Sequence, residues 1–295
     1  MEITNMNTLK ILEDAKKVYI FEPVYDISAA TEQANKKKLD AFGMMAKFNI
    51  LNKPKDEAVH AARSELRYEP FWFIDSNRKI DYKLLLERKL DVDDEYATSI
   101  LIDGKNYEIF EDSKKSFVSN DKRYSTLNVQ YNCNREIKYK TYIDGLGRNI
   151  KSENYEKLFK NSNYKFKEVE DLTNIDNIIN PTFSFSSAIE EMKNSLLREK
   201  IISHEILTDD AIVDKIYLYF RPVYAFEFIW SNENKVGIIE IDGLNGEISE
   251  KGVWLKERVS KVMTRDMFFD IGGEIANGMV PGGGVVVKMI DRMTK

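Results

Sequence analysis

The sequence predicts an α+β fold: antiparallel sheets each covered by helices, arranged as two related units of one helix followed by strands. Two observations lead to this prediction. The stretch 216–230 is almost unbroken aromatic and aliphatic, and a polar turn separates it from a second apolar run at 236–241, which is typical of an antiparallel hairpin. A helical pattern followed by an aromatic strand that contains proline occurs twice, at 54–72 and at 188–224. Because neither a helix nor a sheet can bury its apolar side alone, we expect each helix to cover its own strands.

The chain is predicted to divide into five segments, because its composition changes along its length. The run at 151–180 is rich in Lys, Asn and Glu, and Pro181 ends it, as expected for a linker or an insertion. The predicted segments are an N-terminal helix and strand segment at 1–52, a first α+β unit at 53–150, the polar linker or insertion at 151–180, a second α+β unit at 181–252, and a C-terminal helix with a glycine-rich tail at 253–295.

Composition limits the class of protein. A chain of 295 residues with 43% hydrophobic and 32% charged residues is long and apolar enough to fold around a substantial core. Its formal net charge of -5 argues against a dedicated nucleic-acid binder, which would be basic. Cys133 is the single cysteine, so an intrachain disulfide is excluded. The N-terminus lacks the apolar core of a signal peptide, and no run of about 18 apolar residues occurs, so we expect a cytoplasmic protein without a transmembrane segment.

The N-terminal segment is predicted to contain three elements. A short helical pattern surrounds Leu9, and the aromatic and β-branched residues at 18–25 indicate a strand that carries Pro23. The stretch 29–48 contains good helix formers and a basic run, so we expect a helix there.

In the first unit, an amphipathic helix is predicted at 54–67. Val59, Ala62 and Leu66 are spaced by three and four residues, which places them on one face of a helix. The aromatic run at 68–74 follows directly and reads as a strand.

The rest of the two units is predicted from alternation and capping. The stretch 80–90 is ambiguous between strand and helix, whereas 137–143 alternates apolar and polar residues as a half-exposed strand does. Ser187 and Glu190 fit a capping box, in which each side chain satisfies a free N–H of the first turn, so a helix is predicted at 188–206.

Three segments end in Ile-Asp-Gly, at 102–104, 143–145 and 241–243. Asp-Gly favours a tight turn, because glycine accepts a positive φ and aspartate tolerates one. The aspartates could also act as ligands, but turn geometry accounts for them, so we interpret all three segments as turns between strands.

A family resemblance covers 224–250. An aromatic strand at 224–228 is followed by a polar turn, a second apolar strand that ends at Asp242, and a turn that ends in Gly246 and Glu247 before the next strand. This order resembles a PepSY-type module. The resemblance implies a non-catalytic binding or inhibitory module, often located outside the cytoplasm, whereas this chain begins without a signal peptide.

Aromatic and arginine side chains in the predicted strands are candidate binding residues, because they bury a large area and keep a polar group. Aromatic residues in strands also commonly pack in a core, so both interpretations are open. The candidates are Trp72, Arg221, Tyr224 and Trp230, and Arg67 is noted with them as a cation among aromatic residues.

No catalytic residue is assigned, because the sequence contains no known catalytic motif and no metal-ligand spacing. The two histidines, His60 and His204, lie on predicted helices. The acidic pairs at 93–94 and 209–210 lie in predicted turns, where carboxylates stabilise helix starts without any ligand. We therefore expect no bound metal and no cofactor.

Three functions are compatible with these features. The first is a non-enzymatic module that binds a protein partner, either another protein or a second copy. The second is an enzyme whose acidic residues converge in the fold, and a cavity that joins carboxylates with His60, His204 or Arg221 would favour it. The third is a protein that contacts a membrane surface or another copy through the glycine-rich tail, which follows a predicted helix at 253–271. The alternative for the tail is a hinge and a strand that docks on the sheet.

Overall fold

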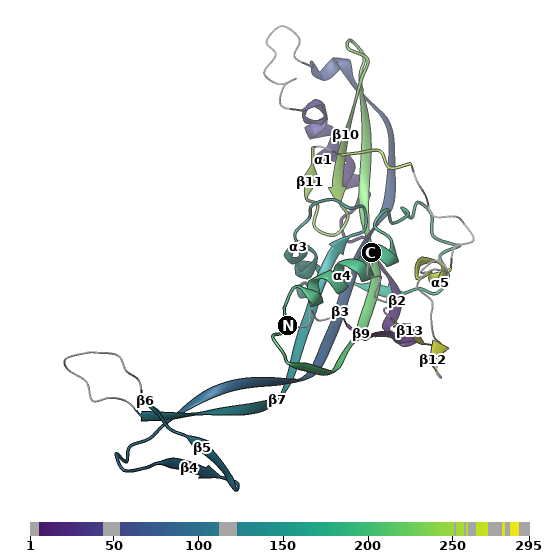
Figure 1. Ribbon diagram of the computed structural model, residues 1–295. Coiled ribbons are helices and arrows are strands. Elements are labelled where there is room, and N and C mark those ends of the chain that lie inside the picture. The colour runs from purple at the N-terminus through teal and green to yellow at the C-terminus, as the bar shows by residue number, and fades with distance from the viewer. Residues whose placement is uncertain are drawn as a thin grey trace, which may run out of the picture.

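The computed structural model describes residues 6–43, 54–111, 123–250, 252–256, 258, 264–270, 279–280 and 284–288. Their main feature is one large sheet with few helices around it (Figure 1). The predicted fold class is therefore wrong. Strands from both predicted units join in a single, mainly antiparallel sheet, which has 11 strands in the described part of the chain, so separate helix-covered units do not form.

Strands predominate over helices in the described residues. The strands are β1 (Thr8–Ile11), β2 (Lys16–Phe21), β3 (Val59–Asp91), β4 (Ser99–Ile102), β5 (Lys105–Glu108), β6 (Phe110–Glu111), β7 (Arg123–Asp144), β8 (Phe166–Glu168), β9 (Glu205–Trp230), β10 (Lys235–Asp242), β11 (Ile248–Ser249), β12 (Met279–Val280) and β13 (Gly284–Lys288). The α-helices are α1 (Ile27–Lys37), α3 (Ser152–Glu156), α4 (Phe185–Leu197) and α5 (Arg265–Phe268), and short 3₁₀ helices are η1 (Glu13–Ala15), η2 (Lys38–Phe42), η3 (Asp56–Ala58) and η4 (Lys157–Lys160).

The long strands β3 and β9 form the centre of the sheet. They run antiparallel from Val59 opposite Trp230 to Lys83 opposite Glu205, with three register shifts between them. β7 pairs with the other side of β3, while β10 pairs antiparallel and β1 and β2 pair parallel with the other side of β9. Because β3 and β9 come from different predicted units, their pairing is what merges the two units into one sheet.

The predicted hairpin around 216–241 is confirmed, since β9 and β10 pair from Trp230 opposite Lys235 to Val223 opposite Asp242. The helix predicted at 54–67 is wrong, because β3 begins at Val59 and pairs with β9 along its length. Here pairing with a distant strand overrides the local helix propensity of alanine and glutamate.

Other helix predictions are corrected in the same way. The pattern around Leu9 belongs to β1, and the ambiguous stretch 80–90 belongs to β3. In the predicted helix 253–271, the described residues are helical only in α5. The helix predicted at 188–206 exists but begins earlier and ends sooner, as α4. Its N-cap is Ser184, whose hydroxyl accepts a hydrogen bond from the N–H of Ser187.

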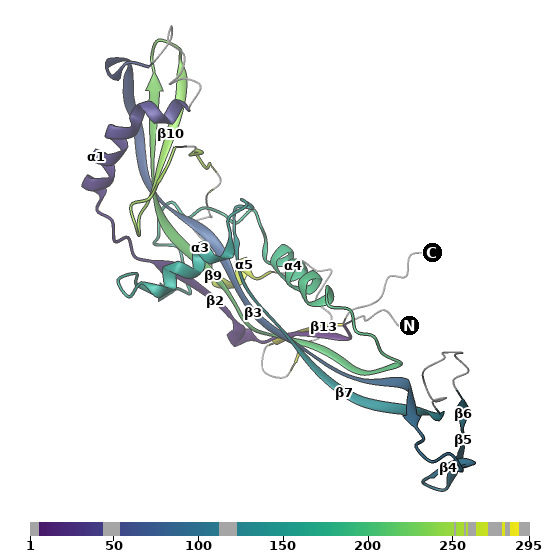
Figure 2. The same cartoon turned by 90° about the vertical axis from the view of Figure 1, so that its left-hand side faces the viewer.

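The core lies on both faces of the central strands. Trp72 and Ile74 on β3 pack on the side of α4, whereas Phe71 and Phe73 pack on the side of Tyr155 in α3, as the alternation of a strand requires. Figure 2 shows α3 and α4 on opposite sides of these strands. A third cluster forms where α1 covers β9 and β10.

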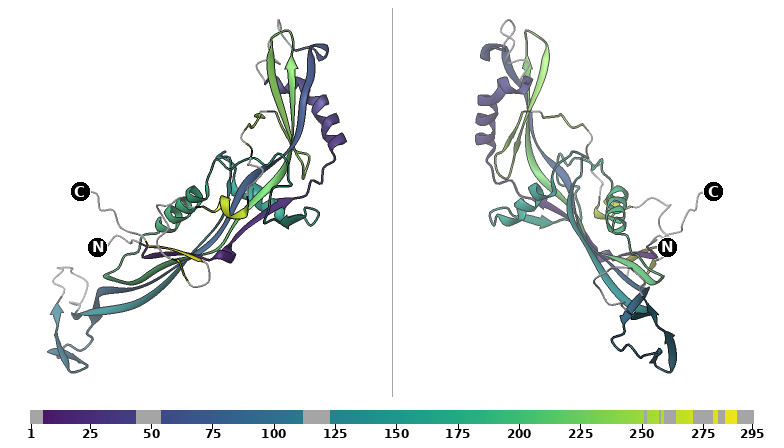
Figure 3. Two further views of the ribbon diagram at one scale, coloured as in Figure 1. Left: turned by 90° about the vertical axis from the view of Figure 1, so that its right-hand side faces the viewer. Right: turned by 60° about the vertical axis from the view of Figure 1, so that its left-hand side comes forward.

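The molecule is elongated, with β10 near one end and the β4–β5 hairpin at the other (Figure 3). Beyond the last residue paired with β9, strands β3 and β7 continue as a two-stranded ribbon. The turn between β4 and β5 has a positive φ at Asp103 (47°) and at Gly104 (75°), which confirms the first predicted Ile-Asp-Gly turn.

The described part of the C-terminal tail docks on the sheet, since β13 pairs antiparallel with β1. The remainder of the predicted glycine-rich tail, at 271–278, 281–283 and 289–295, lies outside the described residues. Among the helices that the structure describes, none combines the length and the apolar composition that crossing a bilayer requires.

Candidate functional site

A buried ion-pair cluster lies where β3 and β9 pair. Glu69 on β3 stands opposite Arg221 on β9, and the Glu69 side chain is 0% exposed. Three guanidinium groups hold its carboxylate. Arg67 donates to Oε1 from Nε and Nη2 at 3.0 and 2.6 Å, while Arg148 and Arg221 reach Oε2 at 2.8 and 3.1 Å. Hydrogen bonds between charged groups of this kind are short and strong, so they offset much of the cost of burying the carboxylate.

The three arginines determine the protonation state of Glu69. Burial alone raises the pKa of a carboxyl group, because it disfavours the charged form. The guanidinium groups of Arg221, Arg148 and Arg67 together outweigh burial and lower the pKa of Glu69 to about 2. The side chain is therefore a carboxylate at neutral pH.

Asp144 and Asp242, from two of the Ile-Asp-Gly segments, extend the cluster. Asp144 accepts hydrogen bonds from Arg148 at 2.7 Å and from the Tyr155 hydroxyl at 2.6 Å, and Asp242 accepts one from Arg221 at 2.6 Å. Each aspartate also accepts backbone N–H groups of the residues that follow it. Burial raises the pKa of Tyr155, so its hydroxyl keeps the proton that it donates.

The glycines of these two segments allow close backbone approach. Gly145 donates its N–H to the Pro70 carbonyl at 2.9 Å, and Gly243 donates to the Pro222 carbonyl at 2.9 Å. A Cβ atom on Gly145 would lie 2.7 Å from the Pro70 oxygen. Neither glycine has a positive φ. The chain does turn after Asp144 and after Asp242, whose carbonyls accept hydrogen bonds from the N–H groups of Gly147 and Gly246. The positive φ that the Asp-Gly pattern predicts is found at 103–104, whereas Gly145 and Gly243 allow close contact with the prolines.

Gly145→Ala is expected to lower the free energy of unfolding by about 1–3 kcal/mol, because the added methyl group meets backbone atoms that cannot move aside cheaply. Urea unfolding of the purified full chain measures the change. Asn149→Ala, at an exposed position after the same turn, is the control and should change stability by less than about 0.5 kcal/mol. Equal stability of the two variants would contradict the close approach.

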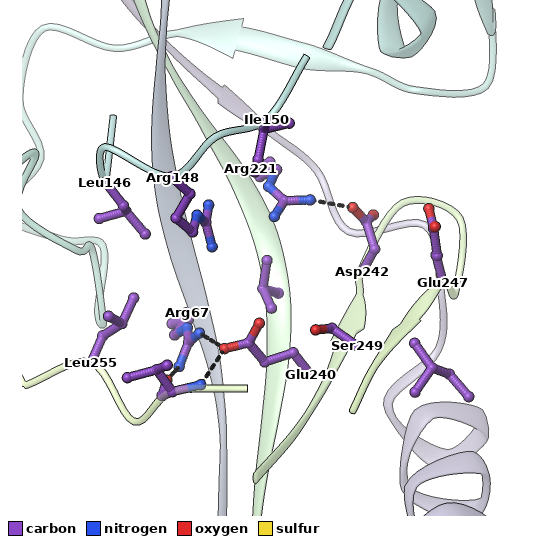
Figure 4. Close-up of a pocket in the computed structure, with 13 residues that line it drawn as sticks. Arg67, Leu146, Arg148, Ile150, Arg221, Glu240, Asp242, Glu247, Ser249 and Leu255 are labelled. Atoms are coloured by element: carbon purple, nitrogen blue, oxygen red, sulfur yellow. Dashed lines mark hydrogen bonds and ion pairs between the residues drawn. The ribbon is translucent and has the colours of Figure 1, made fainter. Parts of the chain in front are cut away.

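A cavity of about 410 Å³ opens beside the cluster (Figure 4). Its charged lining residues form a basic side and an acidic side. The basic side is Arg67, Arg148 and Arg221, and the acidic side, from β10 and the turn after it, is Glu240, Asp242 and Glu247. Ion pairs of 2.6 Å join Arg67 to Glu240 and Arg221 to Asp242, so the two sides of the lining meet at these pairs. Apolar side chains, including Val223 and Leu255, complete the lining.

A second cavity of about 420 Å³ adjoins the first. The two share the lining residues Ile150, Arg221, Asp242 and Glu247, so they form neighbouring parts of one groove. We call the two together the β10 groove. Exposed Lys157 of η4 is one of the residues that line the second cavity. A groove of this size is within the range of sites that bind small molecules or short peptide segments.

No family model, curated protein or solved structure matches this chain. The resemblance of 224–250 to a PepSY-type module therefore stays a prediction. Those residues form the end of β9, then β10 and β11, and they contribute Asp242 and Glu247 to the groove.

The structure does not bring the four predicted binding residues together in one site. Arg221 lines both cavities. Trp72, Tyr224 and Trp230 are buried in core clusters. Trp72 donates its indole N–H to the Phe183 carbonyl at 2.8 Å, so its one polar group has a partner within the protein. For these three aromatic residues the structure therefore supports packing in the core, one of the two interpretations that the sequence left open.

The histidines and acidic pairs lie away from the groove. His60 and His204 are exposed and line neither cavity. The pair at 93–94 is exposed, whereas Asp209 is fully buried against Arg78. These residues are therefore not joined in one site.

Sequence reasoning missed two charged residues of the cluster, Glu69 and Arg148, and it interpreted Asp144 as a turn residue. A signal for Glu69 was present. It precedes proline in an aromatic strand, as Arg221 does, and a charged residue inside an otherwise apolar strand calls for a buried partner. Asp144 and Asp103 both occur in Ile-Asp-Gly segments, which the turn preference of Asp-Gly already explains. The residues around Asp144 therefore gave no sign that it belongs to a buried cluster.

Proposed function

We propose that this protein is a non-enzymatic binding module that takes a segment of a protein partner into the β10 groove. The observation that supports the proposal is the set of ion pairs around Glu69, which fixes the arginines of the groove before any ligand arrives. A site whose side chains are already held in place loses less conformational entropy on binding. The sequence predicts a cytoplasmic location, and we propose that the module acts there.

The chemistry of the groove suits a peptide. Guanidinium N–H groups donate to carbonyl oxygens, and carboxylates accept from amide N–H groups, so the basic and acidic sides complement the two halves of a peptide unit. The apolar side chains between them, such as Val223 and Ile248, can contact aliphatic side chains of the segment. Two adjoining cavities accommodate an extended segment better than a compact ligand.

An enzyme is the second candidate, because the carboxylates of Glu240 and Asp242 do converge with Arg221 in a cavity. Three features favour binding instead. Both carboxylates are already paired with arginines, the pKa of Glu69 at about 2 prevents it from acting as an acid near neutral pH, and neither histidine is near. General acid and base catalysis needs a group whose pKa lies close to the working pH.

Selection of short random peptides displayed on phage against the full chain tests the proposal. Recovered peptides are expected to bind the unmodified protein and to bind Ser249→Trp at least about tenfold more weakly, because an indole at this exposed lining position would occupy the first cavity. The matched control is Ser231→Trp, an exposed position in the β9–β10 turn outside both cavities.

The control variant should bind every recovered peptide with unchanged affinity. Thermal unfolding confirms that both tryptophan variants are folded. Recovery of no binding peptide, or of peptides that bind both variants equally, would refute a peptide-binding role for the groove.

A further inference from the structure

The first cavity has more negative than positive charge around it. Three guanidinium groups, those of Arg67, Arg148 and Arg221, belong to the lining and its supporting cluster. Glu240, Asp242 and Glu247 line the cavity with them and balance their charge, three against three. Glu69 and Asp144, which are buried behind the arginines, bring the total to three positive and five negative charges, a net charge of −2, and Lys157 of the second cavity brings that of the whole groove to −1. The low-dielectric walls of a cleft strengthen the electrostatic potential of such charges. A negative potential attracts cations and disfavours anions.

The arginines nevertheless keep donors for a neutral acceptor. A guanidinium group carries five N–H donors. Within the described residues, Arg221 donates to Asp242 and Glu69, which leaves N–H groups beside the cavity, and the Arg148 side chain is 33% exposed. Peptide carbonyl oxygens can accept from these donors without bringing a negative charge into the cleft.

Glu247 is the carboxylate best placed for a cation from the ligand. Among the residues that the structure describes, its side chain has no hydrogen bond or ion pair, whereas Glu69, Glu240 and Asp242 are paired. It is exposed, it lines both cavities, and Figure 4 places it on the turn beyond Asp242. A ligand can therefore reach it from either half of the groove.

We propose that the segment bound in the β10 groove is a basic peptide, whose lysine or arginine side chain pairs with Glu247 while its backbone carbonyls accept from Arg148 and Arg221. This inference rests on the proposed function and adds the charge of the ligand to it. The net charge of the whole chain, -5, acts in the same direction at long range and speeds the approach of a basic partner.

The experiment uses the peptides recovered by phage selection on the full chain. Each is synthesised with a fluorescent label in two forms, as recovered and with every Lys and Arg replaced by Gln, and its binding is measured by fluorescence anisotropy. The recovered forms are expected to be rich in Lys and Arg. Glu247→Gln should weaken their binding about fivefold, as loss of one partly exposed ion pair does, and added salt should weaken it further. Glu247→Lys should weaken it about tenfold or more.

Glu153→Gln is the matched control, because Glu153 is exposed on α3 and lines neither cavity. It should leave the affinity unchanged. If the glutamine forms bind as tightly as the recovered forms, or if Glu247→Gln has no effect while Ser249→Trp still blocks binding, the basic-peptide inference fails and the proposed function stands. If no peptide binds in a manner sensitive to Ser249→Trp, both fail.

Discussion

Glu69→Gln is expected to lower the free energy of unfolding by about 3–5 kcal/mol, the loss typical of removing one partner from a buried ion pair. The substitution keeps the size of the side chain and removes its charge. An amide has only one oxygen for the three guanidinium groups, and its own N–H donors would point either at Arg67 or at Arg148 and Arg221. Urea unfolding at neutral pH measures the loss, and Glu153→Gln, at an exposed position, should cost less than about 0.5 kcal/mol.

Comparing the unmodified protein with Glu69→Gln at different pH values isolates the part of the pH dependence of stability that comes from Glu69. A glutamate in an unfolded chain has a pKa near 4.5, and that of Glu69 in the folded protein is about 2. Because the folded value is the lower one, the contribution of Glu69 is complete above about pH 4.5 and is lost as the pH falls toward 2. The difference between the two pKa values corresponds to about 3 kcal/mol.

The stability difference between the unmodified protein and Glu69→Gln should therefore shrink as the pH is lowered through this range. A difference that stays constant from pH 7 to the acid limit of folding would show that the carboxylate charge is not what the arginines stabilise.

Local patterns in the sequence predicted local structure well. The β9–β10 hairpin follows from its apolar runs and the polar turn between them, and the β4–β5 turn follows from Asp103 and Gly104. The fold class was wrong for a reason that local patterns do not contain. Helix formers at 59–67 became part of β3 because β9, far along the chain, supplies its hydrogen bonds.

The candidate site was predictable only in part. Arg221 was identified as a binding candidate, but the other three candidates are aromatic residues that are buried in the core. The partners of Arg221 come from β3 and β10, and Arg148, from the turn after β7, shares Glu69 with it. No spacing along the chain relates these residues. What the sequence did carry was the charge of Glu69 within an apolar strand, which indicates a buried partner without identifying it.

A second buried pair, Arg78 with Asp209, allows a sharper test of how this sheet tolerates charge. Both side chains are 0% exposed. Arg78 donates from Nε and Nη2 to the two carboxylate oxygens of Asp209 at 2.7 and 2.6 Å, and from Nη1 to the carbonyl of Leu196 in the last turn of α4 at 2.8 Å. It therefore ties β3 to β9 and satisfies one free carbonyl group at the end of the helix.

Arg78→Met is expected to lower the free energy of unfolding by about 3–5 kcal/mol, because Asp209 is left buried without a countercharge. Replacing both partners, as Arg78→Met with Asp209→Leu, should recover most of the loss, since no charge then remains to be desolvated. Lys79→Met, at the exposed neighbouring position, is the control and should be nearly neutral. Urea unfolding of the four proteins measures these values. If the double variant is as unstable as Arg78→Met alone, the cost lies in the lost connection between the strands and α4 rather than in the unpaired carboxylate, and the argument from desolvation fails.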